Sequence, residues 1–349
     1  MTNPLTNRHD LLLLFEVTNG NPNGDPDAGN MPRIDPNTNR GIVTDVCLKR
    51  KIRNFVELFP KDREKSDTGT DDKKSGNGFN ILIKQGGCIE TEQKNAIVKA
   101  NDESNKLDGK STVEKAKNWL CREFFDVRTF GGVLSTGDDV FKGSAFGQVR
   151  GPVQITFGQS FHPITPLEIP ISICCPRNEA KGEKGQQPTE EKIAKIIIAQ
   201  TGIQGRKHIV PYALYAAKCY VSPSFAEKTG FTTDDYDLLI DAILHMFTED
   251  PSAARSEMVV RGLYDFEHIG THADDTDGAQ KNQNLRETRL GCAHAHELFE
   301  GINISLKDGK EFPESFADYE VVNTWTETTL PKGVKLHLRH NGETVLSSK

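Results

Sequence analysis

The chain has 349 residues and a formal net charge of −7, from 43 Lys or Arg and 50 Asp or Glu. That length suggests one large domain or two ordinary ones, and an acidic balance argues against a nucleic-acid partner unless basic residues gather on one face. The longest apolar run, Leu11 to Phe15, is far shorter than the roughly 18–20 residues of a membrane span. The first ten residues lack the basic-then-apolar order of a signal peptide. We therefore expect a cytoplasmic protein with no membrane partner.

Metal and redox chemistry have little support in the sequence. The seven cysteines are scattered and form no Cys-x-x-Cys pair, so we expect small buried thiols and no zinc site. His268, His272, His294 and His296, together with the acids of residues 274–277, match no standard metal-ligand spacing. Ser135 has no nucleophile-elbow context. We expect no metal and no cofactor.

A strand and a helix are predicted near the start of the chain. Residues 10–17 (DLLLLFEV) are almost continuously apolar, as expected of a central strand covered on both faces. A helix is predicted from Thr44, a suitable N-cap, and Pro60 ends it. Between these bounds the apolar residues recur at helical spacing, at Leu48, Ile52, Phe55, Val56 and Phe59.

Two charged or Gly-rich stretches, 61–111 and 176–191, are predicted to be insertions with little core of their own. Strands are expected at 126–134, 148–161, 169–173, 205–222 and 258–266, with strand-like stretches near Val321 and Val334. Helices are expected at 113–125, 193–197, 234–247 (capped by Thr232 or Thr233) and 294–301. Without the insertions, the order is strand–helix–strand–strand–helix–strand. This predicts an α+β fold of the ferredoxin-like βαββαβ type, which RNA-recognition modules also use.

The stretch VTNGNPNGDPDAGNMPRIDP (17–36) is a long polar loop. It lacks the ending of a P-loop and the glycine spacing of a dinucleotide fingerprint. Asp25 and Asp27 begin a calcium-loop pattern that no further acid completes. A rigid loop that approaches a phosphate or ribose stays open beside ordinary turn chemistry; its candidate side chains are Asn19, Asn21 and Asn23.

Basic residues cluster on the first predicted helix. Five basic residues and one acid lie between Arg40 and Arg53. Lys49, Arg50 and Arg53 are helical neighbours at i+3 and i+4, so they form one stripe. Such a stripe can contact a nucleic-acid backbone without reading its sequence. The alternative is a solvated helix face.

Two smaller basic groups follow along the chain. Arg150 lies in GQVRGPVQ, where neighbouring glycines allow close approach of a ligand to the backbone. Arg206, Lys207 and His208 form a compact trio in GRKH. For either group alone, a simple surface position is the competing interpretation.

Several long blocks resemble a known family. They are NRHDLLLLFEVTNGNPNGDPDAGNMPRIDPNTNRGIVTDVCLKRKIRN, FGGVLSTG, GQVRGPVQITFGQSFHPI, GRKHIVPYALY and SAARSEMVVRGLYDFEH. They are similar to the repeated backbone subunit of type I-C CRISPR Cascade complexes, the guide-RNA-binding Cas-seven family of the RAMP superfamily. The resemblance covers almost the whole chain, and residues 61–111 are its loosest part.

The resemblance implies an RNA-recognition-like palm with finger and thumb insertions. The implied divisions are 1–60 (palm, first strand and basic helix), 61–118 (finger-like insertion), 119–173 (palm strands), 174–207 (thumb-like insertion) and 208–349 (palm completion and C-terminal elements). In related complexes, copies stack head to tail along the guide, and the thumb crosses the RNA at intervals. This requires a grip on the RNA backbone without base readout.

The resemblance also implies site residues. Thr44, Lys49 and Arg53 match the family's first palm helix, which offers a hydroxyl and cations to guide phosphates, and Arg50 lies beside them. The weaker assignments are Asn21, Asn23, Arg150, Gln154, Arg206, Lys207 and His208. No catalytic residue is expected.

The implied partners are CRISPR RNA, target DNA through guide pairing, and further copies of the chain. Cas-five-type, large and small Cascade subunits and, indirectly, a recruited helicase-nuclease complete the set, in antiviral defence. One alternative is a type III-like subunit that cuts target RNA with a metal and a loop acid, for which Asp25, Asp27 or Asp35 is available. A generic RNA-binding chaperone is the other.

Overall fold

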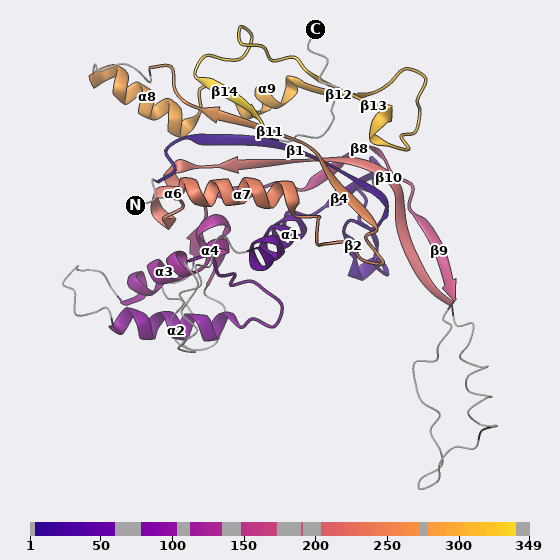
Figure 1. Ribbon diagram of the computed structural model, residues 1–349, viewed down its shortest axis with the longest axis horizontal. Helices are drawn as coiled ribbons and strands as arrows, with labels where there is room; N and C mark the ends of the chain where they lie inside the picture. Colours follow the sequence, from indigo (N-terminus) through magenta and orange to yellow (C-terminus); the bar gives the residue numbers. More distant parts are fainter. Residues whose placement is uncertain are drawn as a thin grey trace.

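The computed structural model describes residues 4–59, 78–102, 112–134, 148–172, 190, 204–272 and 278–339. Within these residues a central antiparallel sheet carries further layers on both faces (Figure 1). Its strand order is β14-β11-β1-β10-β8-β4, and β7 and β9 also pair with β10. The strands are β1 (Arg8–Gly20), β4 (Arg40–Val43), β7 (Val153–Ile155), β8 (Gly158–Pro163), β9 (Leu167–Ser172), β10 (Gln204–Val221), β11 (Glu257–His268) and β14 (Val334–Leu338).

The predicted first strand is the centre of the sheet. Leu11 pairs with Cys219 of β10 on one side and with Asp265 of β11 on the other. Because successive side chains of a strand point to opposite faces, the apolar run supplies two cores. Leu13 and Phe15 pack into one core, and Leu12 and Leu14 pack into the other. The expectation of a central strand covered on both faces is confirmed.

One face of the sheet is covered by α1 (Asp45–Leu58) and α7 (Thr233–His245), with α6 (Pro223–Thr229) nearby (Figure 1). The Thr44 hydroxyl caps α1 by accepting from the Cys47 N–H at 3.3 Å. Thr232 caps α7 in a reciprocal capping box with Asp235. Of the predicted apolar stripe of α1, Leu48, Ile52 and Val56 are buried and Phe55 is half-buried, whereas Phe59, after the end of the helix, is exposed.

The other face carries the C-terminal elements α8 (Gly278–Leu290), α9 (Ala295–Glu300), β12 (Ile302–Leu306), the 3₁₀ turn η3 (Phe316–Asp318) and β13 (Tyr319–Asn323) (Figure 1). Leu298 and Phe299 pack there against Tyr264 and Phe266 of β11. The sequence did not predict α8. The only buried residue of α8 is Thr288, so the helix has no apolar stripe by which its pattern could be seen.

The polar loop contains regular structure. After β1, the chain forms β2 (Gly24–Asp25), the 3₁₀ turn η1 (Pro26–Ala28) and β3 (Met31–Pro32), and β2 pairs with β3. Strand β4 then pairs with β8 at the edge of the sheet. The length of the loop is therefore used for a small hairpin and an edge strand.

A helical unit lies beside α1 and α7, and it differs from the predictions in two ways. It consists of α2 (Ile89–Asp102), α3 (Thr112–Glu123), α4 (Phe125–Phe130), β5 (Gly131–Val133) and β6 (Gln148–Arg150). Residues 61–111 were expected to have little core of their own, yet Leu82, Ala96 and Ala100 are buried in a separate apolar cluster with residues of α3 and α4. Residues 126–134 were expected to be a strand, but α4 forms first, and all six of its residues are buried.

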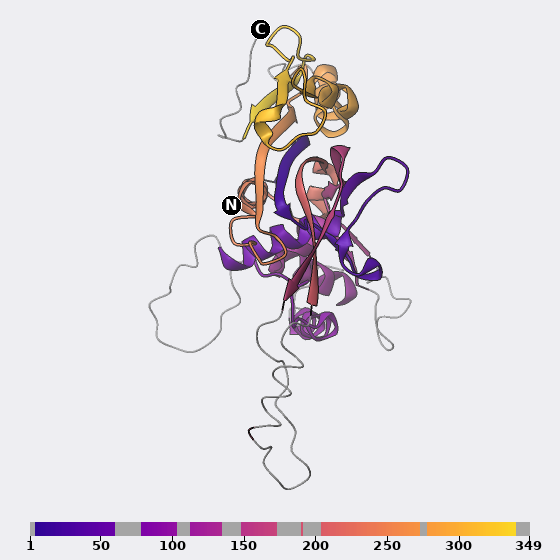
Figure 2. The ribbon, with the colours of Figure 1, turned by 90° about the vertical axis from the view of Figure 1, so that its right-hand side faces the viewer.

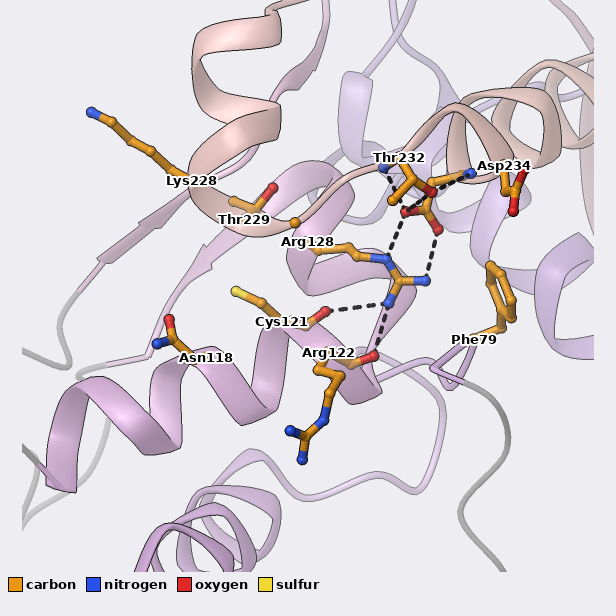
Figure 3. A pocket seen from close by; sticks show the side chains of 11 residues that line it. Phe79, Asn118, Cys121, Arg122, Arg128, Lys228, Thr229, Thr232 and Asp234 are labelled. Atoms are coloured by element: carbon orange, nitrogen blue, oxygen red, sulfur yellow. Dashed lines mark hydrogen bonds and ion pairs between the residues drawn. The ribbon is translucent and has the colours of Figure 1, made fainter. Parts of the chain in front are cut away.

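Arg128 of α4 joins this unit to α7. Its Nε and Nη2 donate to the two carboxylate oxygens of Asp235 at 3.0 and 2.7 Å. Its Nη1 donates to the carbonyl oxygens of Gly78, Cys121 and Arg122. Figure 3 shows the bonds to Asp235, Cys121 and Arg122 at a pocket of about 440 Å³, where the Lys228 and Arg122 side chains extend away from the ion pair. The pair is almost completely buried, with side-chain exposures of 7% and 3%.

Replacing Arg128 with Met should therefore destabilise the protein. The Asp235 carboxylate would stay buried without its guanidinium, which costs about 3–5 kcal/mol of unfolding free energy. Urea unfolding of Arg128→Met measures this loss. Arg122→Met removes an exposed guanidinium from the same pocket, with 59% side-chain exposure, and should change stability by only about 0.5 kcal/mol. Equal losses for the two variants would contradict the structural role of the buried pair.

The transition from α4 to β5 requires a glycine. Gly131 ends α4 with φ +73°, a conformation that side chains other than glycine rarely adopt. A Cβ atom there would also overlap the backbone of Val149 and Gly151. The next residue, Gly132, has no such neighbour, because the nearest atom to its Cβ would be Leu134 Cδ2 at 4.0 Å.

These neighbouring glycines provide a matched test. Gly131→Ala should lower the free energy of unfolding by about 1–3 kcal/mol because the backbone would be strained. Gly132→Ala should leave it within about 0.5 kcal/mol of wild type. The measurement is thermal or urea unfolding of both variants, and a larger loss for Gly132→Ala would contradict the geometry.

Strand β9 and the first half of β10 form a two-stranded ribbon that projects beyond the sheet (Figures 1 and 2). Gln204 pairs with Ser172 at its described end. The predicted thumb-like insertion continues from this point, and residues 173–189 and 191–203, including the helix expected at 193–197, lie outside the described residues. Among the residues that are described, no helix is long and apolar enough to cross a membrane.

Candidate nucleic-acid interface

A basic hollow of about 690 Å³ lies between α1 and the helical unit. It is lined by Val46, Lys49, Arg53, Phe130, Gly131, Gly132, Val133, Gln148, Val149, Arg150, Gly151 and Gln154. Helix α1 turns its apolar stripe to the sheet, and Lys49 and Arg53 lie on the side that faces α4, β5 and β6. The other two basic residues of the helix lie elsewhere, since Lys51 is buried and Arg50 is exposed outside the hollow. Four residues predicted to bind RNA, from sequence positions about 100 residues apart, thus meet in one place.

The charge of the basic hollow is one-sided. Its lining residues include Lys49, Arg53 and Arg150, and among the residues that the structure describes, which exclude 135–147, no aspartate or glutamate lines it. This stands out in a chain whose formal net charge is −7. A concave surface of one sign concentrates the field and attracts ions of the other sign. The basic hollow therefore favours an anionic ligand.

Aromatic rings support the cations. The Lys49 ammonium lies 5.8 Å and the Arg53 guanidinium carbon 5.2 Å from the ring centroid of Phe130. The Arg150 guanidinium carbon lies 4.6 Å from the ring centroid of Phe225 in α6. Such cation–π contacts stabilise a cation without neutralising its charge.

Two of the cations also have carboxylate partners. Lys49 pairs with Asp45 one turn earlier at 2.8 Å. Arg53 donates from Nε to Asp126 Oδ2 at 2.9 Å, and the Asp126 side chain has an exposure of 0%. Both cations keep further N–H donors, since an ammonium has three and a guanidinium five.

Arg150 and Gln154 approach from the strands. Arg150 ends β6 and is exposed, and Gln154 lies in β7, where its Nε2 donates to the Gly151 carbonyl at 3.3 Å. Gly131 and Gly151 allow the two backbones to approach here, because a Cβ on either would overlap the other strand. Gly151, which follows Arg150, and Gly131, which pairs with Arg150, thus serve the close packing of the backbone.

The structure uses Thr44, Asn21 and Asn23 inside the loop. The Asn23 Oδ1 accepts from both the backbone N–H and the hydroxyl of Thr44 at 2.9 Å. Asn21 is buried with an exposure of 4%, and its Nδ2 donates to the Asn30 carbonyl at 2.7 Å. None of the three lines the basic hollow. Their polar groups hold the loop against the start of α1.

The remaining predicted residues lie elsewhere. Arg50 is exposed and does not line the basic hollow. Arg206, Lys207 and His208 lie on β10 within the projecting ribbon, opposite β9. Arg206 pairs there with Glu168 at 2.9 Å. The structure therefore separates this trio from the basic hollow.

Sequence reasoning missed Asp126, Phe130 and Phe225. Asp126 and Phe130 contact the basic helix, and Phe225 contacts Arg150, only in the folded chain. The stretch DVRTFGG does contain an acid, a base and an aromatic residue in close order. That composition was the one available indication that these residues belong to the site. The stretch was predicted to be a strand, so the indication was not used.

The described histidines have other partners, or lie outside any cluster of possible metal ligands among the described residues. His268 is buried and contacts Asp10 at 3.0 Å through Nε2, while its Nδ1 accepts from the Cys292 N–H. Among the described residues, which exclude 273–277, no three His, Cys, Asp or Glu side chains could hold a metal ion together.

A family model described as CRISPR-associated protein Cas7 matches residues 7–324. The chain belongs to the Cas7 family. A CRISPR-associated protein Cas7 of Haloferax volcanii is 30% identical over 265 residues, which cover 72% of this chain and 67% of that protein. The expected family is thus confirmed, while the type I-C subtype stays a prediction.

Solved structures show a distant likeness. A chain of a CRISPR RNA-guided surveillance complex, pre-nicking, has a TM-score of 0.40 and 13% identity, covering 74% of this chain and 75% of that one. A chain of a second CRISPR RNA-guided surveillance complex has a TM-score of 0.37 and 14% identity, covering 80% of this chain and 81% of that one. A chain of a type III-B Cmr-beta complex bound to cognate target RNA has a TM-score of 0.35 and 10% identity, covering 74% of this chain and 60% of that one.

Proposed function

We propose that this Cas7 protein is the CRISPR RNA-binding backbone subunit of a type I-C Cascade complex, and that it holds the RNA backbone in the basic hollow. The observation that carries the proposal is the convergence of Lys49, Arg53 and Arg150 in a hollow whose described lining residues include no acid. Phosphate contacts of this kind position an RNA without reading its bases. The bases then remain available to pair with target DNA.

The proposal includes the architecture of the palm. We infer a ferredoxin-like, RNA-recognition-like core made of β1, α1, β7–β8, β10, α7 and β11. Its support is the antiparallel order β11-β1-β10-β8 and the packing of α1 and α7 in the apolar core of one face. These are the features of a βαββαβ module.

We also propose that copies of the chain assemble head to tail along one guide, together with Cas-five-type, large and small subunits. This part rests on family membership. In such an assembly each copy needs a grip that accepts any guide sequence, which contacts to phosphates supply.

Salt dependence tests the phosphate grip. Each phosphate contact to single-stranded RNA contributes about 0.7 to the slope of log affinity against log salt. The variant Lys49→Ala with Arg150→Ala should therefore bind a labelled single-stranded RNA with a slope shallower by about 1.4. Both residues can be removed without leaving a buried carboxylate unpaired, unlike Arg53.

The matched control is Lys281→Ala with Arg286→Ala, which removes two exposed cations from α8. It changes the net charge equally and should keep the wild-type slope. If both double variants shift the slope by the same amount, net charge explains the binding and the proposed interface is wrong.

We propose further that the chain does not cleave RNA. The loop carboxylates that a type III-like mechanism would use already hold turns: Asp25 accepts from the Asp27 N–H at 3.2 Å, and Asp35 accepts from the Asn37 N–H at 2.9 Å. The hydrogen bonds that Asp35 accepts from the Asn37 N–H and the Thr38 hydroxyl keep its pKa below its usual range.

The assembled particle incubated with Mg²⁺ and a labelled RNA complementary to the guide should leave that RNA intact. Asp35→Asn should then behave like wild type. Regularly spaced cuts that disappear in Asp25→Asn or Asp35→Asn would instead establish the type III-like alternative.

A further inference from the structure

Asp126 of α4 is the buried group behind the basic hollow. Its Oδ2 accepts from Arg53 Nε at 2.9 Å and from the Ile83 N–H at 3.0 Å, and its Oδ1 accepts from the Leu82 N–H at 2.9 Å. The two backbone bonds fix the carboxylate. A fixed carboxylate in turn restricts the side chain that donates to it.

The ion pair between Arg53 and Asp126 uses only one part of the Arg53 guanidinium. Nε faces Asp126, whereas no described residue accepts a hydrogen bond from either Nη group. Arg53 lines the basic hollow, and the Phe130 ring lies against its guanidinium. The two Nη groups form the planar fork that binds two phosphate oxygens at once.

We propose that Asp126 is a positioning residue for RNA binding: it engages Arg53 through Nε and thereby presents the Nη fork to a backbone phosphate in the basic hollow. This inference rests on the proposed function. Asp126 belongs to the helical unit and Arg53 belongs to α1. The helical unit would therefore take part in RNA binding by α1. A free arginine side chain would lose rotamer freedom on binding, and Asp126 removes that cost in advance.

The sign of the effect separates positioning from simple electrostatics. A buried negative charge near the basic hollow repels phosphate, so charge alone predicts tighter RNA binding for Asp126→Asn. Positioning predicts weaker binding, by about five-fold, the effect of immobilising about one long side chain.

Arg53→Lys gives a second test at constant charge. A lysine has one nitrogen, and the Asp126 carboxylate would engage it, so the phosphate would lose its partner. We expect about a five-fold loss of affinity although the net charge is unchanged. In the double variant Arg53→Lys with Asp126→Asn, RNA binding should be no weaker than in Arg53→Lys alone.

Asp250→Asn is the matched control. Asp250 pairs with Lys51, another basic residue of α1, and with Arg255, and neither of these cations lines the basic hollow. The variant removes a carboxylate from a lysine of the same helix and should leave RNA affinity and salt slope unchanged.

The affinity of each variant for a fluorescein-labelled single-stranded RNA, measured across salt concentrations by anisotropy, decides the matter. Unchanged or tighter binding by Asp126→Asn overturns the proposal, and so does an equal loss from Asp126→Asn in the wild-type and Arg53→Lys backgrounds. Thermal unfolding shows whether Asp126→Asn is folded. If it is not, Arg53→Lys decides alone, and wild-type affinity then overturns the proposal.

Failure of the proposed function looks different. If Lys49→Ala with Arg150→Ala binds RNA as wild type does, the basic hollow is not the interface. If that variant is weakened while Asp126→Asn and Arg53→Lys are not, the interface stands and only the positioning role of Asp126 is lost.

Discussion

Helix α4 is held from both sides by ion pairs of opposite polarity, and the rest of the structure is arranged around this constraint. Its Asp126 accepts from Arg53 of α1, and its Arg128 donates to Asp235 of α7. A buried charge is tolerated only with a partner, so one pair fixes the distance between the helical unit and α1, and the other fixes its distance to α7. Two pairs also fix the orientation of the unit.

This arrangement links stability to the candidate interface. The basic hollow exists because α4, β5 and β6 lie opposite the basic side of α1. The side chain that joins the two parts, Arg53, is also one that lines the hollow. A change that loosens the helical unit should therefore affect the grip on an anion even when no cation is lost. The Gly131 turn, which directs the chain from α4 into β5, acts on the same geometry.

The central sheet determines which side of α1 is free. Strand β1 supplies apolar side chains to both faces, and one of those faces takes the stripe of α1. Lys49 and Arg53 are left on the side that faces α4, and the Asn23–Thr44 contacts fix the beginning of the helix. The polar loop thus contributes indirectly, by placing α1.

The sequence by itself determined the elements that strong patterns mark. The two-faced strand β1, the capped helices α1 and α7, and β10 and β11 follow from apolar periodicity and capping chemistry, which act between residues close in the chain. The family and the cations of the first helix were also readable. Asn21, Asn23 and Thr44 were predicted to bind RNA, and in the structure each has an internal hydrogen-bond partner. The sequence does not show such partners.

Only the tertiary structure decided which residues share a site. Arg150 and Gln154 join Lys49 and Arg53 through packing between segments about 100 residues apart, while Arg206 to His208 lie on a separate ribbon. The apolar periodicity of short elements such as α4 is weak when every side is buried, so the sequence suggested a strand there. Its true role depends on partners in α1 and α7 that no local pattern specifies.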